Sequence, residues 1–130
     1  MKVKGYYESY KRGQVIYADL GHKAGGVQSG IRPCVVVSRN ESNHRWAPQI
    51  TVCPLSSNLK DKLVHVKIKP LDVNGYHLKA VSDLLPEDMQ TISKNDVRGT
   101  IGFIAEDSEV MQRINEALMI QLGLMKYSTK

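Results

Sequence analysis

The sequence has few of the residues that build metal centres, disulfides or membrane spans. Its 130 residues include only two cysteines, Cys34 and Cys53, and four scattered histidines without a repeated metal-binding spacing. Each cysteine lies inside an apolar run, so we interpret both as buried free thiols in a reducing compartment. No run approaches the roughly 18 apolar residues of a membrane span, and the N-terminus lacks an apolar segment of signal-peptide length. We expect a cytoplasmic protein that does not bind a membrane.

Several catalytic and nucleotide-binding motifs are also missing. The chain has no Gly-x-x-x-x-Gly-Lys phosphate loop, no Cys-x-x-Cys, no His-Glu-x-x-His and no Gly-x-Ser-x-Gly turn. These absences disfavour a metal site, a nucleotide cofactor and an esterase-type nucleophile. We therefore expect neither a metal nor a cofactor.

The totals indicate one folded domain with a basic balance. Hydrophobic residues make up 42% of the chain and charged residues 24%, which is ordinary for a globular protein. A chain of this length forms one modest core, so we expect a single domain over residues 1–130. Lys and Arg number 18 against 13 Asp and Glu, a net charge of +5. This excess favours a polyanionic partner, although many inert proteins carry it too.

The hydrophobic pattern predicts a mainly β protein. Residues 1–12 form an irregular lead-in, and residues 13–104 contain the strands. In the 63–69 segment apolar and polar residues alternate, so His65, Lys67 and Lys69 are expected to face solvent. Asn74-Gly75 predicts a turn, and the composition of the polar 39–46 loop argues against a place in the core. The expected strands are residues 14–20, 33–37, 50–55, 63–69, 80–85 and 100–104.

One helix is expected, at residues 107–122. Asp107 or Ser108 would cap its start, where acidic residues oppose the helix dipole. Gly123 would end it. Its apolar stripe packs on the core or at a subunit boundary, and consists of Val110, Met111, Ile114, Leu118 and Leu122.

Two residue types at strand ends could bind a phosphate. Arg32 follows the glycine-rich loop of residues 21–31 and precedes Pro33 and a valine strand. A guanidinium group binds phosphate through two parallel hydrogen bonds and stays charged; a structural salt bridge is the alternative. Ser56 and Ser57 close the 50–55 strand, where hydroxyls can hold a phosphoryl oxygen or simply terminate the strand.

Further residues could contact RNA. Lys60, Lys62, Lys67 and Lys69 form a basic strip that phosphates could follow, or a solvated face. Trp46 lies in a polar loop, where it could stack on a base or anchor the loop in the core. His65 could exchange a proton near neutral pH or be a bystander.

The motifs of this chain resemble those of the MazF/PemK toxin family, in the family's order. The family's opening Arg-Gly-Asp-Ile/Val strand appears as Arg12-Gly13-Gln14-Val15, and its Gly-x-Arg-Pro motif as Gly30-Ile31-Arg32-Pro33. No single motif is specific, but the ordered set is. It comprises residues 11–20, 30–33, 46–48, 64–68, 87–92 and 114–124.

The resemblance implies a small SH3-like β-barrel with a C-terminal helix, working as a homodimer. Members are metal-independent, sequence-specific endoribonucleases that cut single-stranded RNA or mRNA and are inhibited by a cognate antitoxin, in a complex that binds DNA. The family's catalytic arginine and Thr/Ser correspond to Arg32 and Ser56. The candidate RNA contacts are Gln28, Trp46, Ser57, Lys60, His65 and Glu87.

The chain departs from the family pattern in the loop before Arg32. Val27 replaces the usual glutamate, and Gly26 stands where PemK-like members have a histidine. A later PemK arginine and aspartate are matched by Leu85 and Glu87. The sequence is therefore closer to the MazF branch.

Three functional hypotheses follow. In the first, the ribose 2′-OH attacks the adjacent phosphorus and leaves a 2′,3′-cyclic phosphate; Arg32 stabilises the charge, Ser56 orients the phosphate, and the general base is unassigned. The second is a gyrase-directed toxin resembling CcdB, which the polar 126–130 tail does not favour. The third is a catalytically silent barrel that binds RNA or a peptide, and it draws support from Val27.

Overall fold

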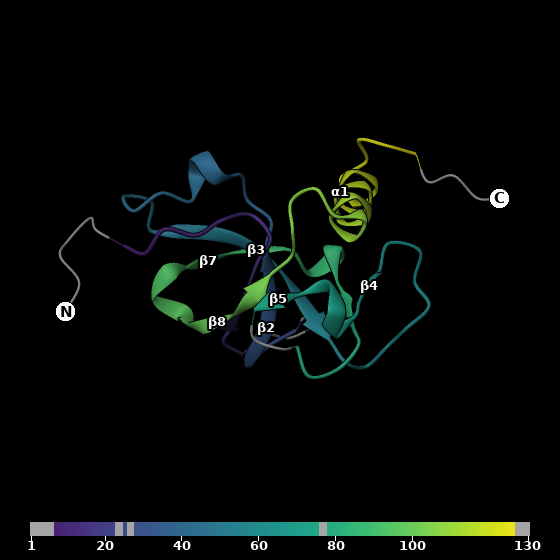
Figure 1. Ribbon diagram of the computed structural model, residues 1–130, viewed down its shortest axis with the longest axis horizontal. Helices are drawn as coiled ribbons and strands as arrows, with labels where there is room; N and C mark the ends of the chain where they lie inside the picture. The colour runs from purple at the N-terminus through teal and green to yellow at the C-terminus, as the bar shows by residue number, and fades with distance from the viewer. Residues whose placement is uncertain (1–6, 23–24, 26–27, 76–77, 127–130) are drawn as a thin grey trace.

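The computed structural model describes residues 7–22, 25, 28–75 and 78–126. Within them, eight strands form one half-barrel sheet and one α-helix packs against it (Figure 1). This confirms the prediction of a mainly β fold with a C-terminal helix. The strands are β1 (Gln14–Asp19), β2 (Ile31–Val36), β3 (Gln49–Ser56), β4 (Val66–Ile68), β5 (Asn74–Gly75), β6 (Ser82–Leu84), β7 (Gln90–Ser93) and β8 (Val97–Phe103); the helix is α1 (Glu109–Gln121), and short 3-10 turns are η1 (Asn40–Ser42), η2 (Pro70–Asp72), η3 (Pro86–Asp88) and η4 (Lys94–Asp96).

The sheet runs in the order β4-β6-β3-β2-β1-β8-β5, and β7 also pairs with β3. β3 therefore has two partners on one side: Gln49–Val52 pair with β7, whereas Leu55 and Ser56 pair with β6. On its other side β3 pairs antiparallel with β2. Pro54, which has no backbone N–H to donate, lies where the partner changes. This fork brings the end of β3 next to β6 and the loop before β4.

Side chains alternate between two buried clusters on the faces of the sheet. Val15, Val35 and Cys53 belong to one cluster, which α1 covers with Met111 and Ile114. The neighbouring residues in sequence point to the other face, because successive strand residues face opposite ways. That second cluster contains Tyr10, Ile16, Ala18, Leu20, Cys34, Val36, Ile50, Val52 and Ile92. Both cysteines are buried and free, as the sequence predicts.

The helix begins and ends as its sequence indicates. Ser108 is the N-cap, and its Oγ accepts the Met111 N–H at 3.1 Å. Gly123 has a positive φ of 74° after the last turn, a conformation that glycine adopts without strain. Leu122, however, is exposed and lies outside the buried stripe, since the helix ends at Gln121. Within the described part of the chain, no helix has the length and apolar character that crossing a membrane requires.

Several strands differ from their predicted bounds. The 63–69 segment contains only the three-residue strand β4, because Leu63 and Val64 lie in a turn before it. In the turn after β4, Gly75 has positive φ but Asn74 does not, and both pair with β8. Residues 90–93 form strand β7, which was not predicted from the sequence. Val27, Gly26 and the 127–130 tail lie outside the described residues, as do residues 1–6 of the lead-in.

Two polar side chains are buried in the core, and one of them contradicts the prediction for the 39–46 loop. Asn43, in the 39–46 loop, is fully buried because its side chain bonds the hydroxyl and the carbonyl of Ser38. Lys94, in the polar stretch after β7, is also buried, with its ammonium bonded to three backbone carbonyls. Satisfied hydrogen bonds allow such groups to lie inside the protein.

Candidate active site

A cavity of about 360 Å³ lies at the C-terminal end of β3. Residues from four separate parts of the chain form its walls: the loop before β2, the end of β3, the loop of residues 57–65, and η3. Polar and charged side chains dominate the walls. The lining residues are Gly25, Gln28, Ser56, Asn58, Lys60, Lys62, His65, Leu85, Glu87 and Asp88.

Ser56 is positioned in this cavity by the last residue pair of the β3–β6 ladder. It lies opposite Asp83 in the antiparallel register. The residue is 5% exposed, and Oγ accepts the Asn58 N–H at 3.2 Å. Because Oγ only accepts in this bond, its own hydrogen remains for an oxygen in the cavity.

Asp83 carries a carboxylate that is completely shielded from solvent. One oxygen, Oδ2, accepts the backbone N–H of Lys60 at 2.8 Å and faces His65 Nδ1 at 3.3 Å. The other, Oδ1, accepts from Lys67 Nζ at 3.4 Å. The carboxylate thus ties β6 to β4 and to the loop between β3 and β4.

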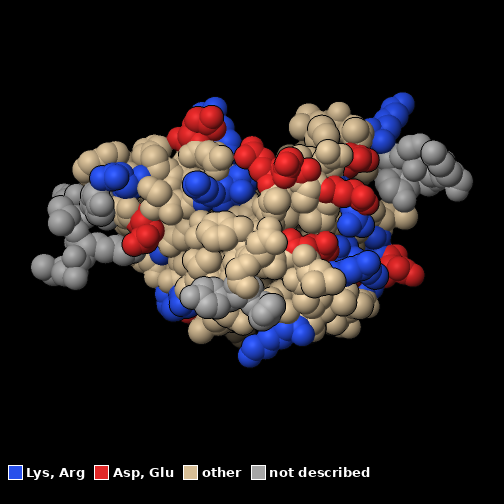
Figure 2. Space-filling model, in the orientation of Figure 1, with Lys and Arg blue, Asp and Glu red and all other residues tan. Residues whose placement is uncertain are grey.

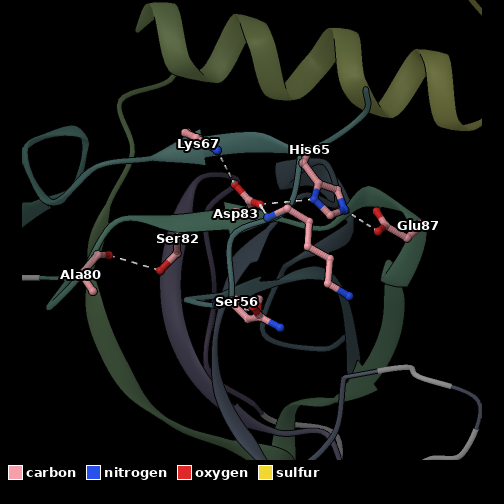
Figure 3. Close-up of polar contacts among 9 residues, drawn as sticks. Ser56, His65, Lys67, Ala80, Ser82, Asp83 and Glu87 are labelled. Carbon is pink, nitrogen blue, oxygen red and sulfur yellow. Dashed lines mark hydrogen bonds and ion pairs between the residues drawn. The ribbon is translucent and has the colours of Figure 1, made fainter. Parts of the chain in front are cut away.

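His65 lies between two carboxylates, as Figure 3 shows. Its Nε2 contacts Glu87 Oε2 at 2.5 Å while Nδ1 faces Asp83. Only 5% of the imidazole is exposed, whereas 29% of the Glu87 side chain is. The prediction that His65 faces solvent was wrong, because the strand begins at Val66 rather than at residue 63 and the ring lies between these two acids.

Arg32 lies beside the cavity rather than among its lining residues. β2 and β3 are antiparallel with Cys34 opposite Pro54, so continuing that register places Arg32 opposite Ser56. Its Nε donates to the Ser29 carbonyl at 2.8 Å. Among the described residues, the structure gives no partner to its two terminal nitrogens.

Gln28 enters the cavity from the loop before β2. Its backbone N–H donates to Asp88 Oδ2 at 3.2 Å, which joins this loop to η3. Its Oε1 is buried and has no hydrogen-bond partner within the described chain. A buried carbonyl oxygen of this kind can accept a hydrogen bond from a ligand.

Two predicted RNA contacts are not among the lining residues. Ser57 is exposed. Trp46 is 61% exposed and precedes β3, at the opposite end of the strand from Ser56. A strand of this length spans roughly 25 Å, and Figure 1 places the η1 loop and the 57–65 loop on opposite sides of the molecule. The structure therefore brings together Gln28, Ser56, Lys60, His65 and Glu87.

A second cavity, of about 400 Å³, adjoins the first beneath α1. It shares Lys60, Lys62 and His65 with the first but has aliphatic walls from Leu63, Val66, Ala117 and Ile120. Of these two cavities, only the first is lined by Ser56 and Glu87.

The cavity walls carry charges of both signs. Lys60 and Lys62 contribute two cations, and Glu87 and Asp88 two carboxylates. Figure 2 likewise shows basic and acidic side chains interspersed over the visible face. Three or more His, Cys, Asp or Glu side chains are nowhere grouped to hold a metal ion within the described ranges.

The buried thiols are not candidate nucleophiles. Burial raises the pKa of Cys34 to about 12, although the nearby Arg32 charge acts in the opposite direction. Burial, and the neighbouring Cys34, likewise raise the pKa of Cys53 to about 12. Because the thiolate is the reactive form, both side chains are inert at neutral pH.

Asp83, Asn58 and Asp88 were missed by the sequence analysis. Asp83 had a detectable signal, since a carboxylate inside the apolar run of residues 81–85 requires a buried partner. Asn58 and Asp88 had none, because polar residues beyond a strand are ordinary loop residues.

Comparison with known proteins shows the family of the chain. The family model of PemK-like, MazF-like toxins of type II toxin–antitoxin systems matches residues 11–122. Endoribonuclease EndoA of Bacillus subtilis (strain 168) is 34% identical over 119 residues, covering 90% of this chain and 97% of that protein.

Solved structures share the fold. An endoribonuclease from a mycobacterial species, in complex with its cognate antitoxin, superimposes with a TM-score of 0.72 at 25% identity and covers 90% of this chain and 98% of that one. MazF from Deinococcus radiodurans does so with a TM-score of 0.71 at 20% identity, covering 89% and 98%. The chain belongs to the family of PemK-like, MazF-like toxins of type II toxin–antitoxin systems.

Proposed function

We propose that the protein is a sequence-specific endoribonuclease toxin that cleaves single-stranded RNA, including mRNA, without a metal ion. The observation that carries this proposal is the convergence of Ser56, Lys60, His65 and Glu87 on one cavity beside Arg32. Family membership and the 34% identity to a protein named endoribonuclease support it. The protein would act in the cytoplasm, where mRNA is found.

The reaction begins with attack by a ribose 2′-hydroxyl on the adjacent phosphorus. The O2′–P bond forms, the P–O5′ bond breaks, and the products are a 2′,3′-cyclic phosphate and a 5′-hydroxyl. The 2′-hydroxyl loses one proton and the leaving oxygen gains one. Charge accumulates on the non-bridging oxygens, so catalysis relies on groups placed to meet that charge.

Arg32 and Ser56 are the pair that would meet it. The terminal nitrogens of Arg32 stabilise the negative charge through a bidentate contact. The Ser56 hydroxyl, held by the Asn58 N–H at 3.2 Å, donates to a phosphoryl oxygen and orients it. On adjacent antiparallel strands, continuation of the register puts both groups at the same end of β2 and β3.

The remaining candidate residues would bind the RNA around the scissile phosphate. Lys60 contacts a phosphate, and Gln28 offers its unpartnered Oε1 to a base or ribose donor. Glu87 and His65 form the opposite wall, and Ser57 follows Ser56 outside it. Trp46 can reach only a nucleotide well removed from the cleavage site.

The protein would be a homodimer that a cognate antitoxin inhibits. A related mycobacterial endoribonuclease has been solved with its cognate antitoxin. An acidic antitoxin segment that covers the cavity would complement the net charge of +5. Neither a gyrase-directed toxin nor a silent barrel is favoured, because the matched relatives are named endoribonucleases.

The test is cleavage of a long unstructured RNA by purified protein in EDTA, with mapping of the fragment 5′ ends. Wild type should cut at fixed sequences, and Arg32→Ala should lower the rate by about a hundredfold or more, the loss seen on removing an oxyanion donor. Arg98→Ala is the matched control, because Arg98 also donates to a backbone carbonyl, that of Asn95, but does not line the cavity. Full activity of Arg32→Ala, or no cleavage by wild type, would refute the proposal.

A further inference from the structure

We propose that Asp83 is a positioning residue for RNA cleavage, which holds Glu87 through His65 at the wall of the Ser56 cavity. The inference rests on the proposed endoribonuclease function and deepens it. Asp83 does not line the cavity. It would act through the groups that its carboxylate orients.

The first step is the burial of the Asp83 carboxylate. A charge without solvent exposure is costly unless hydrogen bonds and opposite charges surround it. Asp83 has three such partners, the Lys60 N–H, the His65 ring and the Lys67 ammonium. An apolar side chain would fill a strand position between Ser82 and Leu84 without any of these requirements.

The second step is the orientation of His65. Both ring nitrogens face carboxylate oxygens, Nδ1 that of Asp83 and Nε2 that of Glu87. A carboxylate only accepts hydrogen bonds, so both contacts are hydrogen bonds when both nitrogens carry a proton. The ring is then a cation fixed at two points and cannot rotate.

The third step is the placement of Glu87. It belongs to the short turn η3, which alone would leave a long side chain several rotamers. The contact from His65 Nε2 to Oε2 selects one of them, and Figure 3 shows Glu87 held at the side of His65 away from Asp83. The second oxygen of Glu87 has no partner among the described residues and can accept a hydrogen bond from RNA.

Charged side chains of both signs surround His65. Asp83 and Glu87 contact the ring, and Lys67 contacts Asp83 from β4. Lys60 and Lys62 lie with His65 in both cavities, while Arg113 and Glu116 of α1 lie with it in the second. His65 therefore links a buried acid to an acid in the cavity.

The test is a double-mutant cycle on the full-length protein, using the same RNA cleavage assay. Asp83→Asn keeps the shape of the side chain, but one amide oxygen cannot replace two carboxylate oxygens. We expect Asp83→Asn and Glu87→Gln each to lower kcat/KM about tenfold to a hundredfold, the range expected when reacting groups are misplaced. The double variant should be no slower than the slower single variant, because both changes break one unit.

Asp72→Asn is the matched control. Asp72 Oδ2 accepts the Lys69 N–H at 2.8 Å, the same distance as in the Asp83–Lys60 contact, but it lies outside both cavities. Its rate should equal that of wild type. If Asp83→Asn does not fold, His65→Gln replaces it in the cycle, because glutamine cannot bridge both carboxylates.

A spectroscopic measurement separates this inference from the proposed function. In 15N-edited NMR spectra, wild type should show two slowly exchanging ring N–H signals from His65, and Asp83→Asn should lose the Nδ1–H signal. This readout does not require activity. A wild-type rate for Asp83→Asn, multiplying effects in the cycle, or unchanged His65 signals would overturn the inference; an inactive wild type would overturn only the proposed function.

Discussion

Lys94 joins three separate parts of the chain through one ammonium group. Its Nζ donates to the carbonyl oxygens of Glu8 at 2.7 Å, Asn43 at 3.2 Å and His44 at 2.7 Å. It also lies 5.6 Å from the centroid of the Tyr10 ring, a cation–π distance. These contacts hold the lead-in and the 39–46 loop against η4.

Lys94→Met should therefore destabilise the protein without touching the cavity. Methionine fills the space but leaves three carbonyl oxygens without their charged donor. We expect a loss of about 3 kcal/mol in the free energy of unfolding, measured by urea denaturation. Lys79→Met, at an exposed position, should change it by less than about 0.5 kcal/mol. Equal effects of the two substitutions would contradict the anchoring role.

The buried thiols predict a loss of stability in alkali. Their pKa values rise from 9.0 to about 12 on folding, so the folded state retains protons that the unfolded chain releases. Their contribution is complete below pH 9 and declines as pH rises toward 12, by about 1.4 kcal/mol per pH unit for each thiol. Denaturation at several pH values should give a shallower decline for Cys53→Ala than for wild type. Equal pH dependence of the free energy of unfolding in the variant and in wild type would contradict this prediction.

Residues with local signals were predictable, and residues with distant partners were not. Both cysteines were expected in the core because each lies in an apolar run, and both are buried. The burial of Lys94 was not predicted, because nothing near it in sequence reveals a partner 86 residues away. The orientation of His65 was predicted wrongly for the same reason, since its partners Asp83 and Glu87 come from later elements.

At the scale of elements, α1 shows the most complete agreement between sequence and structure. Its cap, its stripe and its terminal glycine act over three or four residues. Strands depend on pairing with distant segments, so β7 was missed and β4 was predicted too long. The position of Ser56 at the end of a strand could be predicted from the β3 sequence alone. The cavity around it could not, because it also depends on the placement of β6 and η3.

The cap of α1 gives an element-scale prediction. Ser108→Ala removes the acceptor of the Met111 N–H and should cost about 1 kcal/mol in the free energy of unfolding. Ser108→Asp should retain most of the stability, because aspartate also caps and its charge suits the helix start. Thermal denaturation of both variants measures this. An alanine variant as stable as the aspartate variant would contradict a capping role.

At the scale of the whole molecule, charge is mixed rather than gathered. The net charge is +5, and basic and acidic side chains alternate over the face in Figure 2. Long-range attraction of RNA is therefore weak in this view, and binding depends on the few cations at the cavity.

Salt dependence should report those few contacts. For single strands, the slope of log K against log salt is about −0.7 per phosphate contact. Lys60→Gln should reduce the steepness by about 0.7, measured with 2′-O-methyl RNA, which has no attacking hydroxyl. Lys69→Gln, at a lysine outside both cavities, should leave the slope unchanged. The same slope for wild type and Lys60→Gln would exclude a phosphate contact.

The two partners that β3 has on one side are synthesised after β3 itself, so the cavity is completed late during translation. Ribosomes deliver a chain from its N-terminus, so Ser56 emerges before its partner Asp83, and β1 emerges long before β8, with which it pairs. A chain that ends before η3 thus lacks one wall of the cavity however long translation pauses. Under the proposed activity, only chains in which both β6 and η3 have been made can cleave RNA, and the ribosome is protected from the toxin until that point in synthesis.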